Sequence, residues 1–316
     1  MLIDTTPHLI VAFAGCSPST WLQAKAPLEP KNLAKLMRGM KLVATDSGTL
    51  TSLSPPHERV LAKALRITGS STPTDGLLPW AAFEAKATPN QAWAFITLCH
   101  WSMGREHATL TDPAALDITP DESRTLLADM QPYFATEGIT LHYQEGKPSQ
   151  WLAEGAVFKA LPTASLDRAM GRNVDPLLPQ SKAIKLLQNE MQMLLYAHRI
   201  NDARVEKRQL TINSFWLSGT GALSQAADLN PLVTVNRALA PAAFTDDWAA
   251  FAAGWAQLDA TDLTRFLSLQ QNGQTVRISL CGESNAVTFE TAGHSIFSKI
   301  KSAFKLQSMD YLLKQL

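Results

Sequence analysis

Two histidines and an aspartate stand close together in the middle of the chain. His100 and His107 flank the segment HWSMGREH, and Asp112 follows it. Imidazole nitrogens and carboxylate oxygens are ligands that a divalent metal accepts, so these three side chains are a candidate metal site. Their spacing matches no standard metal-binding motif. The alternative is a polar cluster that hydrogen-bonds its own loop beside Trp101.

A second candidate is a loop that carries two arginines. Within the segment LPTASLDRAMGRNVDPLLP, Asp167 and Arg168 are adjacent and Arg172 follows them. An arginine fork binds phosphate or carboxylate through two parallel hydrogen bonds, which suits a loop that clamps a small anion. The alternative is an internal brace, in which the aspartates neutralise the arginines and hold a long loop in place.

A third candidate group follows the most regular predicted helix, 182–198. Polar side chains from His198 to Arg204 could bind a second anion, although the helix dipole alone also favours cations at a helix C-terminus. Asn213 lies in a predicted strand, Thr211–Leu217, that is followed by a turn at Gly219-Thr220-Gly221. A phosphate-binding loop leads into a helix, and no helix signal follows this turn. We include Arg204 and Asn213 among the candidate ligand-binding residues.

The elements that would position these groups alternate between strands and helices. Apolar runs predict strands at Leu9–Ala14 and Trp93–Leu98, and the segments 276–280 and 286–290 predict a hairpin. Helices are predicted at 28–40, after Ser54, at 120–130, 182–198, 248–257 and 295–316. The alternation indicates an α/β fold, with a mixed sheet core, helices on both faces and a smaller α+β insert. We expect the core to comprise 1–90 and 181–316, and the insert to comprise 91–180.

Composition narrows the class of partner and the compartment. The 316 residues contain 28 Lys and Arg against 28 Asp and Glu, so no strong field attracts nucleic acid or an anionic membrane. The apolar run at 9–15 is too short to span a bilayer, and no basic segment precedes it as in a signal peptide. The three cysteines form no CxxC pair, which fits a reducing compartment. We therefore expect a cytoplasmic protein with no nucleic-acid or membrane partner.

One stretch carries a resemblance to a known family. Residues 188–221, QNEMQMLLYAHRINDARVEKRQLTINSFWLSGTG, resemble archaeal-type cofactor-independent phosphoglycerate mutases, which belong to the alkaline-phosphatase superfamily. The whole chain is similar to bacterial proteins described as phosphoglycerate-mutase-like or as regulators of pathogenicity factors. The shared landmarks are SPPHE at 54–58, CHW at 99–101, LPTASLDR at 161–168 and NSFWLSG at 213–219. The resemblance implies a reduced alkaline-phosphatase-like core with an insert like the mutase substrate domain.

The chain departs from the mutases at the metal site. Their mechanism uses two metal ions and a nucleophilic serine, and their first metal ligand is an Asp directly after the first core strand. Here the segment Phe13-Ala14-Gly15-Cys16 stands at that place, and the chain contains no adjacent Asp-His pair. We therefore predict a non-catalytic, regulatory or small-anion-binding protein without a cofactor. Its expected ligand is a phosphorylated or carboxylated metabolite.

Two alternatives stay open. An active phosphoglycerate mutase or phosphatase would need a divalent metal such as manganese, magnesium or zinc. A protein-interaction module would instead dock a partner through the predicted terminal helix at 295–316.

Overall fold

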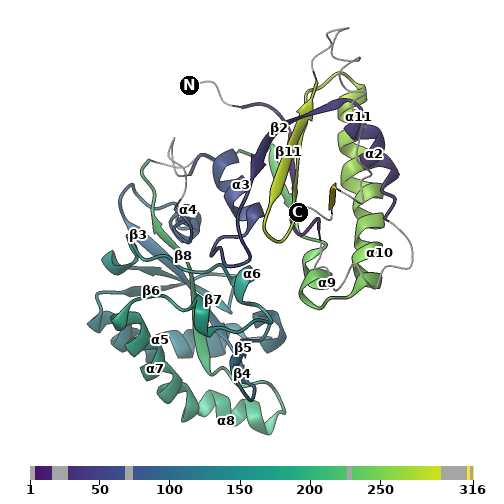
Figure 1. Cartoon of the computed structure of the whole chain (residues 1–316). Helices are drawn as coiled ribbons and strands as arrows, with labels where there is room; N and C mark the ends of the chain where they lie inside the picture. The colour runs from purple at the N-terminus through teal and green to yellow at the C-terminus, as the bar shows by residue number, and fades with distance from the viewer. Residues whose placement is uncertain (1–3, 16–27, 68–73, 226–229, 293–311, 314–315) are drawn as a thin grey trace. The chain divides into compact units, whose positions relative to one another are not determined.

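The chain forms two compact units in the computed structural model (Figure 1). The structure describes residues 4–15, 28–67, 74–225, 230–292, 312–313 and 316. Unit 1 comprises Met1–Thr51, Pro55–Leu65 and Leu229–Leu316, and unit 2 comprises Ser52–Ser54 and Arg66–Asp228.

Unit 1 is built on a mixed five-stranded sheet with the order β2-β11-β10-β1-β9. Its strands are β1 (His8–Val11), β2 (Met40–Asp46), β9 (Val233–Asn236), β10 (Arg277–Cys281) and β11 (Ala286–Thr291). β1 is parallel to both β9 and β10, whereas β11 is antiparallel to β10 and to β2. The predicted mixed sheet is confirmed, and so is the hairpin formed by β10 and β11.

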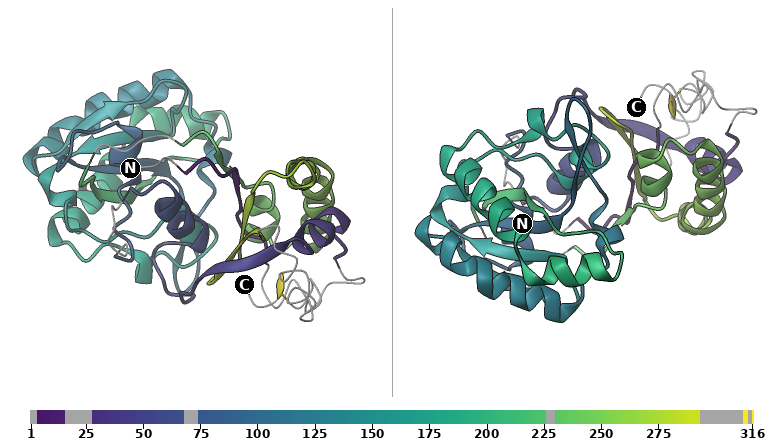
Figure 2. Two further views of the ribbon diagram at one scale, coloured as in Figure 1. Left: turned by 90° about the horizontal axis from the view of Figure 1, so that it is seen from above. Right: turned by 90° about the horizontal axis from the view of Figure 1, so that it is seen from below.

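Helices cover both faces of this sheet, as predicted. One face packs against α2 (Lys31–Met37), α10 (Trp248–Leu258), a π-helical turn (Asp259–Leu263) and α11 (Thr264–Gln271), and α9 (Ala240–Phe244) precedes α10. In Figure 2, α10 and α11 lie together in green beside the strands of unit 1. The other face packs against α3 (Pro56–Ala64). Alternate residues of β1 point to opposite faces of the sheet. Leu9 and Val11 pack in the core with α2, α10 and α11, whereas Ile10 packs against Val60 of α3.

Unit 2 contains an antiparallel four-stranded sheet with the order β6-β7-β3-β8. Its strands are β3 (Ala92–Cys99), β6 (Thr140–Tyr143), β7 (Gln150–Glu154) and β8 (Ser214–Ala222). The helices α5 (Pro120–Thr136) and α7 (Lys182–Tyr196) pack against it through residues such as Phe134 and Met191. The unit also contains α4 (Trp80–Glu84), β4 (Trp101–Met103), β5 (Ala108–Leu110), α6 (Leu166–Ala169), α8 (Arg199–Glu206) and 3-10 turns at Pro113–Leu116, Ala156–Phe158 and Asp175–Leu177.

The limits of unit 2 differ from those expected for the insert. Residues 91–180 were expected to form it, but β3 pairs along its length with β8, as in the pair Leu98 and Phe215. A strand that lies beyond residue 180 therefore completes this sheet, and the unit extends from Arg66 to Asp228. The partner of β3 could not be assigned from local sequence, because sheet pairing joins segments far apart along the chain.

The expected turn at Gly219-Thr220-Gly221 is wrong, because these residues lie inside β8. Gly219 has a φ of +63° and Gly221 a φ of +132°, and the ladder between β3 and β8 shifts register beside them. A Cβ atom on Gly219 would lie 2.7 Å from Cδ2 of Phe95. The glycines therefore form a bulge that brings the backbone close to a neighbouring side chain.

The placement of His198 at a helix C-terminus is also wrong. α7 ends at Tyr196, and His198 is the N-cap of α8, where its Nδ1 accepts a hydrogen bond from the Ile200 N–H at 3.2 Å. Its Nε2 lies 3.0 Å from Oδ2 of Asp129. α8 escaped the sequence prediction because its buried side chains, Asn201 and Arg204, are polar and leave no apolar periodicity.

Most of the predicted terminal helix at 295–316 lies outside the described residues. Within the described ranges, no helix is both long enough and apolar enough to cross a membrane.

Candidate functional site

The two arginines of the predicted anion loop occupy different environments. α6 contains Asp167 and Arg168, which are both buried, and the Ser165 hydroxyl accepts a hydrogen bond from the Asp167 N–H at 3.3 Å. Arg172 is exposed in the turn that follows, and its backbone N–H donates to the carbonyl oxygen of Ala169. A shared clamp of Arg168 and Arg172 on one anion stays a prediction.

Arg204 is bound inside unit 2 by several hydrogen bonds. Its side chain is 1% exposed, Nε donates to the Leu210 carbonyl at 2.7 Å, and Nη1 donates to Glu122 at 2.9 Å. Nη2 donates to the carbonyl of Leu116. Burial would raise the pKa of Glu122, but hydrogen bonds from Thr119 and Arg204 outweigh it and hold this pKa below the ordinary value. The geometry thus gives Arg204 a role in joining α8 to α5.

The three residues of the predicted metal site do not converge. His100 Nδ1 donates to the Thr211 carbonyl at 2.8 Å, and Asp112 accepts a hydrogen bond from the Ala114 N–H at 2.9 Å. His107 is exposed on the segment between them. Their possible ligand atoms do not all lie within 4.8 Å of one another, as they do in a set of side chains able to hold one ion.

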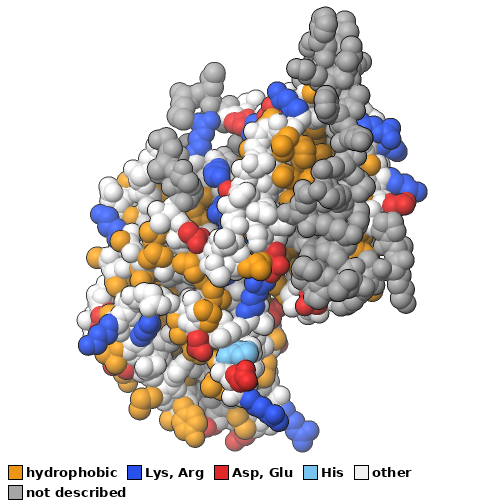
Figure 3. Space-filling model, in the orientation of Figure 1, with side chains coloured by type: hydrophobic (Ala, Val, Ile, Leu, Met, Phe, Trp, Pro, Cys, Tyr) orange, Lys and Arg blue, Asp and Glu red, His pale blue; other side chains and the backbone are white. Residues whose placement is uncertain are grey.

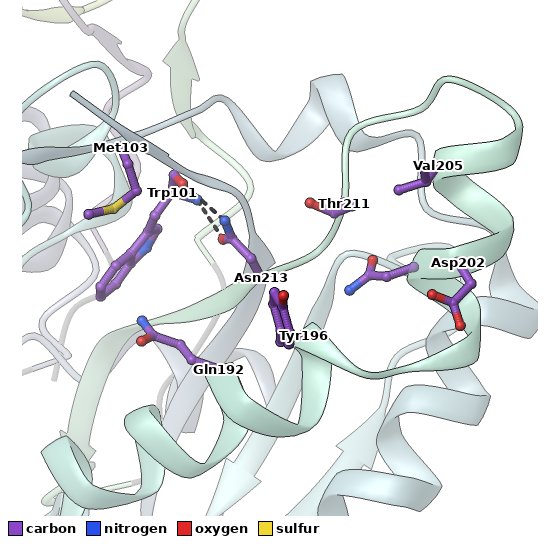
Figure 4. A pocket seen from close by; sticks show the side chains of 9 residues that line it. Trp101, Met103, Gln192, Tyr196, Asp202, Val205, Thr211 and Asn213 are labelled. Carbon is purple, nitrogen blue, oxygen red and sulfur yellow. Dashed lines mark hydrogen bonds between the residues drawn. The ribbon is translucent and has the colours of Figure 1, made fainter. Parts of the chain in front are cut away.

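A pocket of about 440 Å³ lies in unit 2 between β4, α7, α8 and the segment that leads into β8. Its lining residues are Trp101, Met103, Gln192, Tyr196, Asn201, Asp202, Val205, Thr211 and Asn213. Figure 4 shows Trp101, Met103 and Gln192 at one end, Asp202 and Val205 at the other, and Tyr196 and Asn213 between them. Asn213 was predicted as a ligand-binding residue, and it lines this pocket.

Hydrogen bonds of two asparagine side chains hold the frame of the pocket. Asn213 accepts from the Trp101 N–H at 2.7 Å and donates to the Trp101 carbonyl at 3.0 Å, which fixes β4 to the start of β8. Asn201 donates to the carbonyls of Leu195 and Ile212, both at 2.7 Å, and accepts from the Ile212 N–H at 2.9 Å. These amides fix β4, α7 and α8 relative to one another, so the pocket is largely pre-formed.

Exposed apolar side chains surround the pocket. Tyr196 is 90% exposed, Met103 is 80% exposed and Val205 is 62% exposed. Hydrophobic side chains also gather over α7 at the lower edge of unit 2 (Figure 3), where Leu186 and Met193 are exposed. The sequence contained this signal, because Met193 and Tyr196 fall outside the apolar stripe of α7, but the prediction did not use it.

The lining favours binding of a flat molecule over acid–base chemistry. Trp101 and Tyr196 offer aromatic faces, and the Gln192 amide offers a donor and an acceptor. Asp202 is the charged residue of the described lining, and its carboxylate would attract a cationic group. Pockets that bind small ligands combine apolar walls with a few polar groups in this way.

A second cluster lies in unit 1, where the parallel strands β1 and β9 end. Phe13 follows β1 with a φ of +58°, and its ring centroid lies 5.1 Å from that of His57 and 4.9 Å from that of Phe244. Arg237 follows β9, donates to Nε2 of His57 at 3.2 Å and lies 5.9 Å from the Phe13 ring. Ligands of open α/β sheets bind at the carboxyl ends of the strands, so this cluster is a candidate site too.

No protein-family model matches the chain, and no match was found among curated proteins. Two distant solved structures are similar to it over most of its length. The cofactor-independent phosphoglycerate mutase from Thermoplasma acidophilum DSM 1728 shares 10% identity at a TM-score of 0.36, with 92% of this chain and 91% of that chain covered. The PH0037 protein from Pyrococcus horikoshii shares 12% identity at a TM-score of 0.46, with 91% and 88% covered.

At these identities the likeness concerns the fold alone, and the mutase activity is a property of the Thermoplasma protein. The resemblance to bacterial regulators of pathogenicity factors stays a prediction.

Proposed function

We propose that this protein binds a small molecule in the pocket of unit 2 without transforming it, and that it has a regulatory role. The observation that supports the proposal is the pre-formed pocket of about 440 Å³ with Trp101 and Tyr196 in its lining. A neutral or cationic ring would stack on these side chains, hydrogen-bond to Gln192 and be attracted by Asp202. Binding would then couple α7 to α8, because both helices contribute to the lining.

The residues where β1 ends support the non-catalytic part of the proposal. Phe13 stands in the segment where the mutases carry their first metal-binding Asp, and its ring packs against His57 and Phe244. An aromatic ring offers no ligand to a hard divalent cation, so this segment does not fit the metal site of the mutases. We expect no interconversion of 2- and 3-phosphoglycerate and no phosphatase activity with added manganese, magnesium or zinc. Turnover that a chelator abolishes would restore the enzyme alternative.

Two exposed tyrosines of unit 2 give a matched test of the pocket. We expect the purified protein to be stabilised by a flat neutral or cationic compound in a thermal-shift screen of metabolites. Tyr196→Ala should weaken binding of that compound about tenfold, which corresponds to about 1.4 kcal/mol, because one aromatic face is lost. Tyr133, on α5, is 41% exposed and does not line the pocket, so Tyr133→Ala should bind normally.

The pocket proposal fails if no compound stabilises the protein. It also fails if a stabilising compound binds Tyr196→Ala and Tyr133→Ala with equal affinity in calorimetry.

The cluster in unit 1 favours a second candidate function, which is binding of a phosphorylated or carboxylated metabolite. Arg237 is exposed at the end of β9, and His57 lies in the first turn of α3, where the helix dipole also favours an anion. We expect Arg237→Met to weaken the binding of such an anion about tenfold, or by about 1.4 kcal/mol. Arg265→Met, on an exposed arginine of α11, should not.

Inorganic phosphate, 3-phosphoglycerate and citrate are suitable probes of this candidate. If none of them raises the melting temperature of the wild-type protein, the anion site does not exist. A protein partner for the terminal helix and a cytoplasmic location stay predictions.

A further inference from the structure

The helix α7 exposes large apolar side chains on the side that faces away from unit 2. Its buried side chains pack in the core of that unit. On the opposite side, Leu186 is 53% exposed, Met193 is 77% exposed and Tyr196 is 90% exposed, and they contribute to the hydrophobic surface over α7 (Figure 3). Contiguous exposed apolar side chains of this kind typically mark an interaction surface.

Five exposed residues follow one another along this side of α7 at intervals of three or four. Because successive residues of an α-helix are turned by about 100°, they lie within an arc of about 80°. We call them the outer face of α7: Lys182, Leu186, Asn189, Met193 and Tyr196. The outer face offers a second helix a continuous stripe on which to pack.

The order of residues on the outer face is self-complementary. If a second copy of α7 runs antiparallel with a two-fold axis at Asn189, each residue faces the one that lies equally far beyond the axis. Leu186 then faces Met193 of the second copy, and Lys182 faces its Tyr196. The two-fold axis repeats both contacts, so apolar groups meet apolar groups and an ammonium group meets an aromatic ring at each end.

The charges of α7 also favour the antiparallel arrangement. The helix begins with Lys182 and Lys185, and it has no acidic residue in its first turn and no basic residue in its last turn. The two lysines therefore lie at the positive end of their own helix dipole, where a cation is destabilised. In an antiparallel pair they lie beside the negative end of the other helix, whereas a parallel pair would bring the lysines of both copies together.

We propose that this protein forms an antiparallel homodimer through the outer face of α7. One helix pair buries on the order of 1,000 Å² in total, which is the lower limit for a specific interface. Glu190 is half-buried at the edge of the outer face, and its two copies would repel one another near the axis. The dimer is therefore weak, with a dissociation constant in the micromolar range.

Sedimentation of the full-length protein over a series of concentrations tests the dimer. Met193→Lys should weaken dimerisation at least tenfold, because it places a charge against an apolar side chain. Tyr133→Lys, at a 41% exposed position of α5, should dimerise like the wild type. Leu186→Lys replaces Met193→Lys if that variant is not folded by circular dichroism.

Cysteine variants test the antiparallel direction. Asn189→Cys should form a disulfide-linked dimer under mild oxidation, because its two copies meet at the axis. Lys182→Cys should not, because its two copies lie about 21 Å apart along the helices. The wild-type protein gives the background from its own three cysteines.

The proposal is overturned if the wild-type protein sediments as a monomer up to about 500 µM, which would leave the outer face to a helix of a different protein. It is also overturned if Met193→Lys and Tyr133→Lys dimerise alike, or if Lys182→Cys cross-links as readily as Asn189→Cys. The pocket of unit 2 is not lined by Met193 or Leu186, so these variants leave the ligand test of the proposed function intact.

Discussion

Replacing Arg204 with alanine is expected to lower the free energy of unfolding by about 3–5 kcal/mol, the range seen when one partner of a buried ion pair is removed. The guanidinium group is 1% exposed and connects Leu210, Leu116 and Glu122. Without it, the carbonyl oxygens of Leu210 and Leu116 lose this donor, and the Glu122 carboxylate keeps only its hydrogen bonds from Thr119. The measurement is urea unfolding followed by circular dichroism.

Arg199→Ala is the matched control, because Arg199 lies on the same helix with an exposed side chain. This change is expected to alter stability by less than about 0.5 kcal/mol, as surface substitutions usually do. If Arg204→Ala were as stable as Arg199→Ala but had lost ligand binding, the ligand role predicted from sequence would be correct and the structural role wrong.

Acidification is expected to destabilise unit 1 through His8. Burial and the neighbouring charge of Arg277, against an opposing effect of Asp4, lower the pKa of His8 from 6.5 to about 4. Between these two values the unfolded chain binds a proton that the folded chain does not, so stability falls as the pH falls from about 6.5 toward 4. Between pH 7 and pH 4.5 the expected loss is about 2 kcal/mol.

Urea unfolding at several pH values checks this expectation with two variants. His8→Gln should lose the part of the pH dependence that His8 contributes, whereas His107→Gln, at an exposed position, should retain it. Carboxylates with lowered pKa values change stability only at lower pH. The pKa of Asp4, for example, falls from 3.8 to about 2. An unchanged slope in His8→Gln would show that His8 is not buried in its neutral form.

The parts of the fold that sequence predicted have strong local signals. Leu9–Val11 of β1 belong to a continuous apolar run, and α7 carries the stripe of Ile184, Leu187, Met191 and Leu195. α5 begins with a capping box of Thr119 and Glu122, and its acidic first turn was visible in the sequence. In these segments the periodicity of burial and the local propensities agree, so no tertiary information was needed.

Other elements depend on contacts that the local sequence does not encode. β2 was not predicted, because most of its side chains are exposed and no alternation marks it. α8 has polar buried residues, and the glycines of β8 gave a turn signal although they form a bulge within a strand. All three errors arise where a neighbouring segment, rather than the local pattern, determines the conformation.

The candidate site was predicted only in part. Asn213 is one of the residues predicted to bind a ligand, and it does line the pocket of unit 2. Trp101 and Tyr196 were not selected, because an aromatic residue at a pocket and one in a core look alike in a single sequence. Arg204 was selected for its charge, and its burial could be known only from the packing of α5 and α8.

The discontinuous course of unit 1 has a consequence for the order of folding during synthesis. His8 and Ser279 are hydrogen-bonded but stand 271 positions apart, and both neighbours of β1 come from beyond residue 230. On the ribosome, β1 therefore emerges before both of its partner strands and stays unpaired while the whole of unit 2 is made. An apolar strand with unpaired edges is a target for chaperones and for aggregation during that interval. Unit 2 is expected to fold first and to shorten the effective loop that β1 and β10 must close.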